Sequence, residues 1–283
     1  MINKDTKFLI IGLGLMGGSY ALALKQQGYA VSAITKEQSS IDYAVAHGII
    51  DKGDTDINET LVKEADIIVF ALYPHVFIDW IKNNRNLFRK GQIITDVTGV
   101  KHTVVKPVQE LLNGRVEFIA AHPMAGREVY GVENATSEMF KGANYIVVPT
   151  ENNTPMAIDT AKRLGEILGF ARISVLSPEE HDKMIGFVSQ LTHCIAVALM
   201  TCNDNTHLVD YTGDSFRDLT RIANINEDMW TELFLLNRDV LANEIDVFAK
   251  ELERIKDMLQ NGDSEGMKEV MRLSTKRRKL FNK

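Results

Sequence analysis

The stretch that decides the fold is FLIIGLGLMGG, which runs from Phe8 to Gly18. Apolar residues suited to a buried strand lead directly into the pattern G-x-G-x-x-G, and a segment with helical spacing follows. In this pattern Gly12 permits a tight turn, Gly14 lets the backbone approach a pyrophosphate, and Gly17 lets the helix pack closely on the strand. The free N–H groups of the helix N-terminus then bind the phosphates. We therefore predict a dinucleotide site, against the alternative of a strand–helix turn without a ligand, and its residues are Gly12, Leu13, Gly14, Leu15, Met16 and Gly17.

Outward from this loop, short apolar runs alternate with amphipathic segments as far as about residue 175. The predicted strands are residues 8–11, 30–34, 67–72, 92–95, 116–120, 145–148 and 172–175. Amphipathic segments between them include residues 16–27, 41–47 and 158–168. Alternation of helices with strands that are apolar on both faces predicts an α/β fold with a parallel, doubly wound sheet.

The pattern changes after residue 176. Ser177, Pro178 and Glu180 stand where an N-cap, a first helical residue and a capping-box acid are expected. Helical spacing then continues through residues 183–200, 215–222, 228–258 and 264–281. We predict two domains, residues 1–176 and an all-helical domain of residues 177–283. The long apolar stripe of Trp230–Leu259 favours homodimerisation through the second domain, and a helix buried within its own domain is the alternative.

The composition excludes several classes of protein. The chain of 283 residues is 45% hydrophobic and 25% charged, which is typical of a globular protein, and its net charge of −6 argues against nucleic acid or an anionic membrane as a partner. No signal peptide is recognised, and no apolar run reaches the roughly 18 residues of a membrane helix. Cys194 and Cys202 are expected to be buried, unpaired thiols of a reducing compartment. These observations predict a cytoplasmic protein.

The choice between NAD and NADP depends on the end of the second strand, where an acid usually holds the ribose 2′-hydroxyl. Here Thr35 takes the expected position and Lys36 follows it. A hydroxyl and a cation suit a 2′-phosphate, so NAD(P) is the predicted cofactor and NADP is favoured over NAD. Glu37 would serve the NAD diol if the strand ended two residues later.

A histidine ends the apolar run FIAAHPMAGRE, which spans Phe118–Glu128. We expect the strand to stop before His122 and the chain to turn there. Ligands of such sheets bind beyond the carboxyl ends of the strands, so His122 would lie near the nicotinamide and the substrate. A neutral imidazole would suit the general base that hydride transfer from a carbinol requires. A capping histidine satisfied by the backbone is the alternative.

Five motifs together carry a resemblance. They are the glycine loop, DVTGVK at residues 96–101, HPMAGRE at 122–128, SQLTH at 189–193, and FRDLTRIA at 216–223 followed by Trp230. The combination resembles the prephenate/arogenate dehydrogenase family over nearly the whole chain. The resemblance implies a Rossmann domain plus a helical dimerisation domain like that of 6-phosphogluconate dehydrogenase. It also implies the NAD(P)-dependent oxidative decarboxylation of prephenate, or of its amino analogue arogenate, on the route to tyrosine.

The resemblance also implies roles for individual residues. His122 would take the proton of the substrate hydroxyl, and Arg221 would bind a substrate carboxylate while Asp218, three residues earlier, holds it in place. Residues that would line the substrate site are Glu128, His193 and Trp230. The sequence departs from the family at Gly99, where many members have a substrate-contacting serine, so Thr98 is the candidate for that hydroxyl.

Two other functions stay open at this point. A β-hydroxyacid dehydrogenase shares the two-domain layout and would depend on a lysine near Lys183, and a non-catalytic dinucleotide sensor would need neither His122 nor Arg221. No Cys, His and carboxylate set has the spacing of metal ligands, so no metal is expected. The sequence leaves open prephenate against arogenate, and whether tyrosine inhibits.

Overall fold

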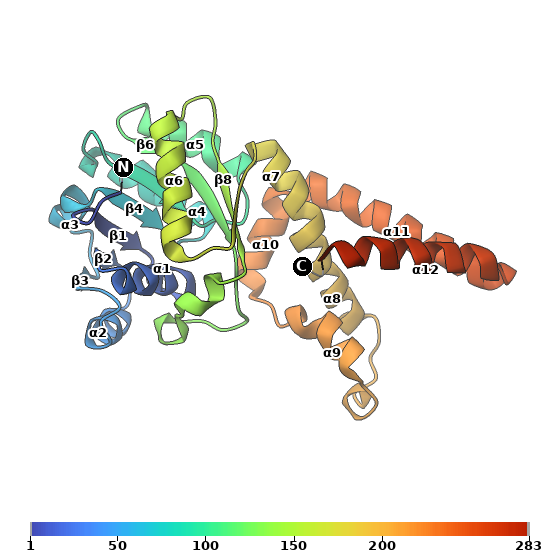
Figure 1. The fold of residues 1–283 in the computed structure, drawn as a ribbon. Coiled ribbons are helices and arrows are strands. Elements are labelled where there is room, and N and C mark those ends of the chain that lie inside the picture. The colour runs from blue at the N-terminus through green and yellow to red at the C-terminus, as the bar shows by residue number, and fades with distance from the viewer. Residues whose placement is uncertain (1, 282–283) are drawn as a thin grey trace.

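The first part of the chain is a parallel sheet covered by helices on both faces (Figure 1). The computed structural model describes residues 2–281. Six parallel strands lie in the order β3-β2-β1-β4-β5-β6, which is the doubly wound order of dinucleotide-binding domains and confirms the predicted fold class. The strands are β1 (Lys7–Ile11), β2 (Ala30–Ile34), β3 (Lys52–Asp54), β4 (Ile67–Phe70), β5 (Ile93–Asp96) and β6 (Glu117–Phe118).

Helices follow most of these strands, because a parallel strand needs a crossover before the next strand begins. They are α1 (Leu15–Gln26), α2 (Gln38–Ala46), α3 (Glu59–Glu64), α4 (Pro74–Asn84) and α5 (His102–Leu112). One more helix of this part of the chain, α6 (Pro155–Leu168), comes later in the sequence. The four residues of β1 after the exposed Lys7 show why this strand is apolar on both faces. Phe8 and Ile10 lie in the core cluster on one face of the sheet, and Leu9 and Ile11 lie in the cluster on the other face.

Two predictions about strands are corrected, the first of them by a second sheet. Its strands are β7 (Ala120–Met124), β8 (Asn144–Val148) and β9 (Arg172–Val175), and β7 runs antiparallel to β8. The predicted end of a strand before His122 is wrong, because β7 continues through His122 and Pro123. Pro123 is tolerated there because β7 is an edge strand of this sheet. The short strand β3 was also missed, since its sequence KGD carries no apolar pattern.

The chain after residue 176 is helical. Its first helix, α7 (Pro178–Ile185), begins with the predicted capping box between Ser177 and Glu180. It continues through a π-helical turn, η4 (Gly186–Leu191), into α8 (Thr192–Thr201). The single helix predicted over residues 228–258 is instead two helices, α10 (Glu227–Leu236) and α11 (Arg238–Asn261), which meet at Asn237. The buried Asn237 side chain donates to the main-chain oxygen of Asp182 and to Gln190, and these bonds hold the break.

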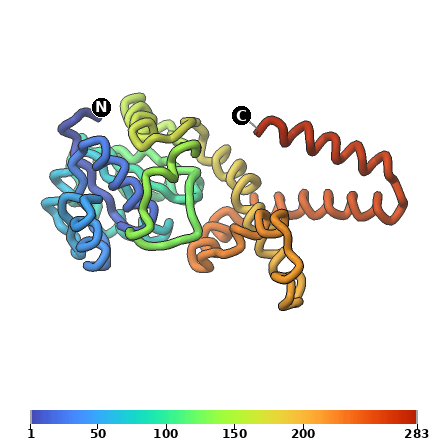
Figure 2. Tube along the Cα trace, turned by 60° about the horizontal axis from the view of Figure 1, so that its bottom comes forward, coloured from blue at the N-terminus to red at the C-terminus, as the bar shows by residue number. Residues whose placement is uncertain are grey.

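Two long helices extend from the body of the molecule as a hairpin (Figure 2). They are α11 and α12 (Ser264–Arg278), and Leu241 is the one buried side chain of this pair within the described residues. Large apolar side chains stand exposed on the hairpin, namely Ile245, Val247, Leu252, Leu259, Met271 and Leu273. One copy of the chain therefore leaves much of this surface uncovered.

Two further expectations change with the structure. Cys194 is partly buried, but Cys202 is exposed, so the prediction of two buried thiols is wrong for Cys202; both are free thiols. Contrary to the expectation from the sequence, the continuous helix Pro178–Thr201 is long and apolar enough to cross a membrane by length and composition alone, with a mean hydropathy of 1.6 over an 18-residue window. This helix carries buried polar residues, His181 and Asp182 among them, that bond to the first part of the chain.

Candidate active site

The glycine loop has the geometry that a bound dinucleotide requires. Gly12 has a φ of +95°, which other residues rarely adopt, and a Cβ at Gly17 would lie 1.9 Å from the oxygen of Gly12. Gly14 is different, because no atom lies within 4 Å of the position its Cβ would take. This space lies at the N-terminus of α1, which Gly14 caps without a side-chain hydrogen bond. The loop therefore fits a pyrophosphate between Gly12 and Gly17.

The end of β2 lies beside this loop. β2 ends at Ile34, so Thr35 takes the first position after it, and the Thr35 hydroxyl accepts a hydrogen bond from the N–H of Leu13 at 3.3 Å. Lys36 and Glu37 are exposed, and Glu37 is the N-cap of α2. Lys36 is therefore the first charged side chain after the strand.

A buried ion pair lies at the end of β5. Lys101 Nζ is 2.6 Å from Asp96 Oδ2, and both side chains are fully inaccessible to solvent. The same pair holds the edge of β7, because Asp96 accepts from the N–H of Ala121 at 3.1 Å and Lys101 donates to its carbonyl oxygen at 2.7 Å. Every polar group of Ala121 is thus fixed by side chains, and Ala121 immediately precedes His122. Asp96 and Lys101 are the first and last residues of the DVTGVK motif, which predicted no role for either.

His122 points its Nδ1 atom at a second histidine. His122 Nδ1 and His181 Nε2 are 2.9 Å apart, and the residue is half-buried. Burial lowers the pKa of His122 well below its usual value, and the neighbouring His181 and Lys101 lower that pKa further. The imidazole is therefore neutral near pH 7, which is the state in which a histidine accepts a proton.

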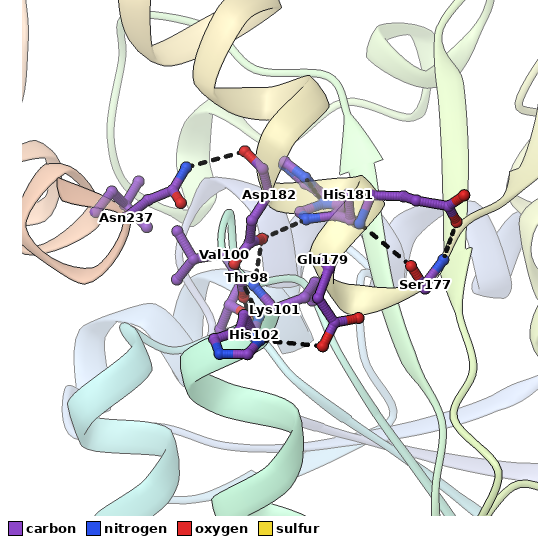
Figure 3. A network of polar contacts seen from close by, with 12 residues as sticks. Thr98, Val100, Lys101, His102, Ser177, Glu179, His181, Asp182 and Asn237 are labelled. Atoms are coloured by element: carbon purple, nitrogen blue, oxygen red, sulfur yellow. Dashed lines mark hydrogen bonds and ion pairs between the residues drawn. The ribbon is translucent and has the colours of Figure 1, made fainter. Parts of the chain in front are cut away.

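The His181 ring in turn contacts the carboxylate of Asp182 (Figure 3). Asp182 Oδ1 is 2.7 Å from His181 Nδ1, and the carboxylate also accepts the N–H groups of Lys101 and His102 at 2.8 Å each. His181 and Asp182 are buried, and both were missed as site residues. The adjacent His and Asp on a capped helix were visible in the sequence, but their contact with His122, 59 residues away, was not.

Arg221 contacts the first part of the chain. Its Nη1 atom is 2.5 Å from Oε1 of Glu128, which lies six residues after His122. No ion pair between Asp218 and Arg221 exists in the described part of the chain, so the expectation that Asp218 holds Arg221 is corrected: Glu128 does so. The reason is local. Asp218 lies in α9 (Asp214–Thr220) and is exposed, whereas Arg221 begins the next turn, η6 (Arg221–Ala223).

Helix α10 brings further side chains to the same region. Trp230 stacks on His193, with ring centroids 3.7 Å apart, and Glu232 is 2.7 Å from the backbone nitrogen and from Nδ1 of His75 at the start of α4. His193 Nδ1 is 2.8 Å from the oxygen of Ser189, so Nδ1 carries the proton and Nε2 is an acceptor. Burial lowers the pKa of His193, so this ring is also neutral near pH 7.

Thr98 and Gly99 lie between the ion pair and α10. The Thr98 hydroxyl is buried and bonds to the Asp96 carboxylate, to the oxygen of Val100 and to Lys101 Nζ. It is therefore engaged with the buried ion pair. A Cβ on Gly99 would lie 3.3 Å from Leu233 of α10 and 4.0 Å from Cε1 of His122. Leu233 thus takes up the space that a longer side chain at position 99 would need.

These contacts place a neutral base, a guanidinium and two stacked rings around one junction between the two parts of the chain. Such a set can take a proton, bind a carboxylate and cover a small cyclic substrate. Within residues 2–281 no group of three or more His, Cys, Asp or Glu side chains has the geometry of a metal site.

Comparisons with known proteins identify relatives of this chain. The family model described as "Prephenate dehydrogenase, nucleotide-binding domain" matches residues 20–174, and the model of the corresponding dimerization domain matches residues 177–273. A prephenate dehydrogenase of Lactococcus lactis is 32% identical over 92% of this chain and 73% of its own length. A cyclohexadienyl dehydrogenase of Zymomonas mobilis is 29% identical over 95% of this chain and 94% of its own. The crystal structure of Aquifex aeolicus prephenate dehydrogenase with hydroxyphenyl propionate and NAD+ superposes with a TM-score of 0.89, at 29% identity, over 99% of this chain and 100% of that one.

Proposed function

The chain belongs to the prephenate dehydrogenase family, and from that premise we propose that it oxidatively decarboxylates prephenate to 4-hydroxyphenylpyruvate. The observation that carries this proposal is the interdomain pair of Glu128 and Arg221, which holds the Arg221 guanidinium against the segment that follows β7, six residues after His122. The test is an assay that follows reduced cofactor at increasing prephenate concentration. An enzyme that binds dinucleotide but reduces none with prephenate or arogenate would be the sensor instead.

The roles of the residues follow from the chemistry of this substrate, a ring that bears a hydroxyl, a carboxylate and a pyruvyl side chain. When bound, the dinucleotide supplies the hydride acceptor, and the ring then loses carbon dioxide and becomes aromatic. His122 accepts the hydroxyl proton, since its ring is neutral. Its position is fixed by the preceding residue, Ala121, whose carbonyl oxygen accepts a hydrogen bond from Lys101. Arg221 binds a carboxylate with the N–H groups that Glu128 leaves free. His193 and Trp230 cover the ring.

Replacing Arg221 with alanine tests the carboxylate contact. A charge-assisted, bidentate contact contributes about 1.5–3 kcal/mol, so we expect KM for prephenate to rise by about 10–100-fold with little change in kcat. Steady-state kinetics at saturating cofactor measure both constants. Arg217→Ala is the matched control, because Arg217 pairs with Asp214 in its own helix and should keep the wild-type KM. A KM within twofold of wild type in Arg221→Ala would remove Arg221 from the site.

We propose NADP as the preferred form of the NAD(P) cofactor, although the crystal structure of the Aquifex relative is a complex with NAD+. Lys36, exposed directly after Thr35, is the cation available to a 2′-phosphate. We expect Lys36→Ala to lower kcat/KM for NADP+ by about tenfold, which is the effect of losing about 1.4 kcal/mol, and to leave NAD+ unchanged. Lys52→Ala, which removes another exposed lysine paired with Glu64, is the control. A wild-type enzyme that uses NAD+ better, with no effect of Lys36→Ala, would reverse the assignment.

Arogenate is the alternative substrate, and the name of the Zymomonas relative covers the wider class of cyclohexadienyl substrates. Comparing kcat/KM for both substrates decides between them, and adding tyrosine to the same assay shows whether it inhibits. The β-hydroxyacid dehydrogenase alternative is disfavoured, because Lys183 is exposed rather than placed beside His122.

We also propose a homodimer in the cytoplasm, with a domain boundary near Leu176. Support for the dimer is the exposed apolar side chains of α11 and α12 and the description of the matching family model as a dimerization domain. Support for the boundary is the end of β9 at Val175 and the capped start of α7 at Pro178.

A further inference from the structure

Three side chains in hydrogen-bond contact form a row that ends at His122, the proposed base. Asp182, His181 and His122 are linked by contacts of 2.7 Å and 2.9 Å, and His181 and Asp182 have almost no exposure to solvent. Asp182 is also fixed through its backbone, because its carbonyl oxygen accepts from Asn237 at 3.0 Å (Figure 3). These contacts with the surrounding fold therefore hold the three side chains in this arrangement.

The direction of each hydrogen bond in this row can be deduced from Asp182. Its carboxylate accepts the N–H groups of Lys101 and His102 at the start of α5, where the helix dipole favours a negative charge. An ionised carboxylate can only accept, so His181 Nδ1 carries the proton of their contact. Burial lowers the pKa of His181, so the ring is neutral and its Nε2 is an acceptor. His122 Nδ1 must then donate to His181 Nε2.

We propose that Asp182 and His181 are positioning residues that hold His122 in the Nδ1–H tautomer, with the lone pair on Nε2. This inference rests on the proposed function, because it decides which nitrogen takes the proton of the substrate hydroxyl. In the reaction the O–H bond breaks, its proton forms a bond to Nε2, and the resulting imidazolium keeps its Nδ1–H bond to His181. The other charged groups near His122 are Asp96 and Lys101, which are paired with each other.

The tautomer can be measured without substrate or cofactor. In protein labelled with ¹⁵N-histidine, long-range ¹H–¹⁵N correlation spectra at pH 7 distinguish protonated from unprotonated ring nitrogens, and the His122→Asn and His181→Gln variants assign the two rings. We expect both His122 and His181 to be neutral with the proton on Nδ1. A proton on Nε2 of His122, a mixture of tautomers, or a doubly protonated ring would overturn the proposal. The result does not depend on which substrate the enzyme uses.

Kinetics of two His181 variants give the second readout. His181→Phe removes the acceptor, and we expect kcat to fall by about 10²-fold or more, as expected for a base in the wrong tautomer, with KM within about twofold because His181 does not contact substrate. His181→Gln keeps an amide oxygen within reach of His122 Nδ1 and should recover most of that loss. His207→Gln, an exposed histidine beside Asp210, is the control and should keep wild-type kcat.

The outcomes separate the two proposals. A folded His181→Phe variant with wild-type kcat would overturn the positioning role, and if that variant does not fold, the tautomer of the wild-type protein decides. An enzyme without dehydrogenase activity but with Nδ1–H on His122 would refute the proposed function and leave the geometry intact.

Discussion

The His122→Asn variant should lose kcat by about 10²–10⁴-fold, the range typical of removing a general base. The reason is that asparagine keeps a polar side chain at this position of β7 but has no lone pair of comparable basicity. Steady-state rates at saturating prephenate and cofactor measure the loss. Cofactor affinity, measured by fluorescence titration, is the control and should match wild type, because the glycine loop is untouched. A wild-type kcat in this variant would remove His122 from the chemistry.

The pH dependence of the wild-type enzyme provides a second check on the same residue. Burial, His181 and Lys101 all lower the pKa of His122 in the folded protein. A base works in its neutral form, and a lowered pKa keeps it neutral to lower pH. We therefore expect kcat/KM to stay level as the pH falls from 8 to the usual histidine value of about 6.5, and to decline only below it. An acidic limb centred above pH 6.5 would contradict this assignment.

The fold was largely predictable because its strongest signals are local. The run Phe8–Gly18 contains a strand, a turn and a helix start within eleven residues, and the capping box at Ser177 marks a helix start in four. What was missed depends on contacts distant in sequence. The antiparallel pairing of β7 with β8 and the break at Asn237 are examples, since Asn237 owes its position to bonds with Asp182 and Gln190.

The residues of the candidate active site were predicted from a different kind of signal than the fold was. His122, Arg221 and Trp230 were predicted as site residues through motifs that resemble a family, whereas spacing alone would have assigned each a structural role. Asp218 was expected to hold Arg221 because the two are three residues apart, but Glu128 holds it from 93 residues away. Partners at that separation leave no periodic pattern, so no local rule could have identified them.

The buried pair of Asp96 and Lys101 leads to the largest expected effect on stability. Replacing Lys101 with methionine leaves the Asp96 carboxylate buried without its counter-ion, and we expect the free energy of unfolding to fall by about 3–5 kcal/mol. Urea unfolding followed by circular dichroism measures this change. Lys52→Met is the control, because it breaks an exposed pair with Glu64 and should leave the free energy of unfolding nearly unchanged.

A double variant separates the charge effect from loss of packing. Asp96→Leu with Lys101→Met removes both charges, so it should be more stable than Lys101→Met alone, although the N–H of Ala121 then lacks its acceptor. A free energy of unfolding of Lys101→Met within 1 kcal/mol of wild type would show that the buried charge of Asp96 is removed in another way, for instance by protonation.

The Lys101→Met variant should lose kcat as well, because Lys101 fixes the carbonyl of Ala121 and so sets the position of His122. We therefore expect stability and catalysis to be coupled through Lys101, whose side chain is fully inaccessible to solvent.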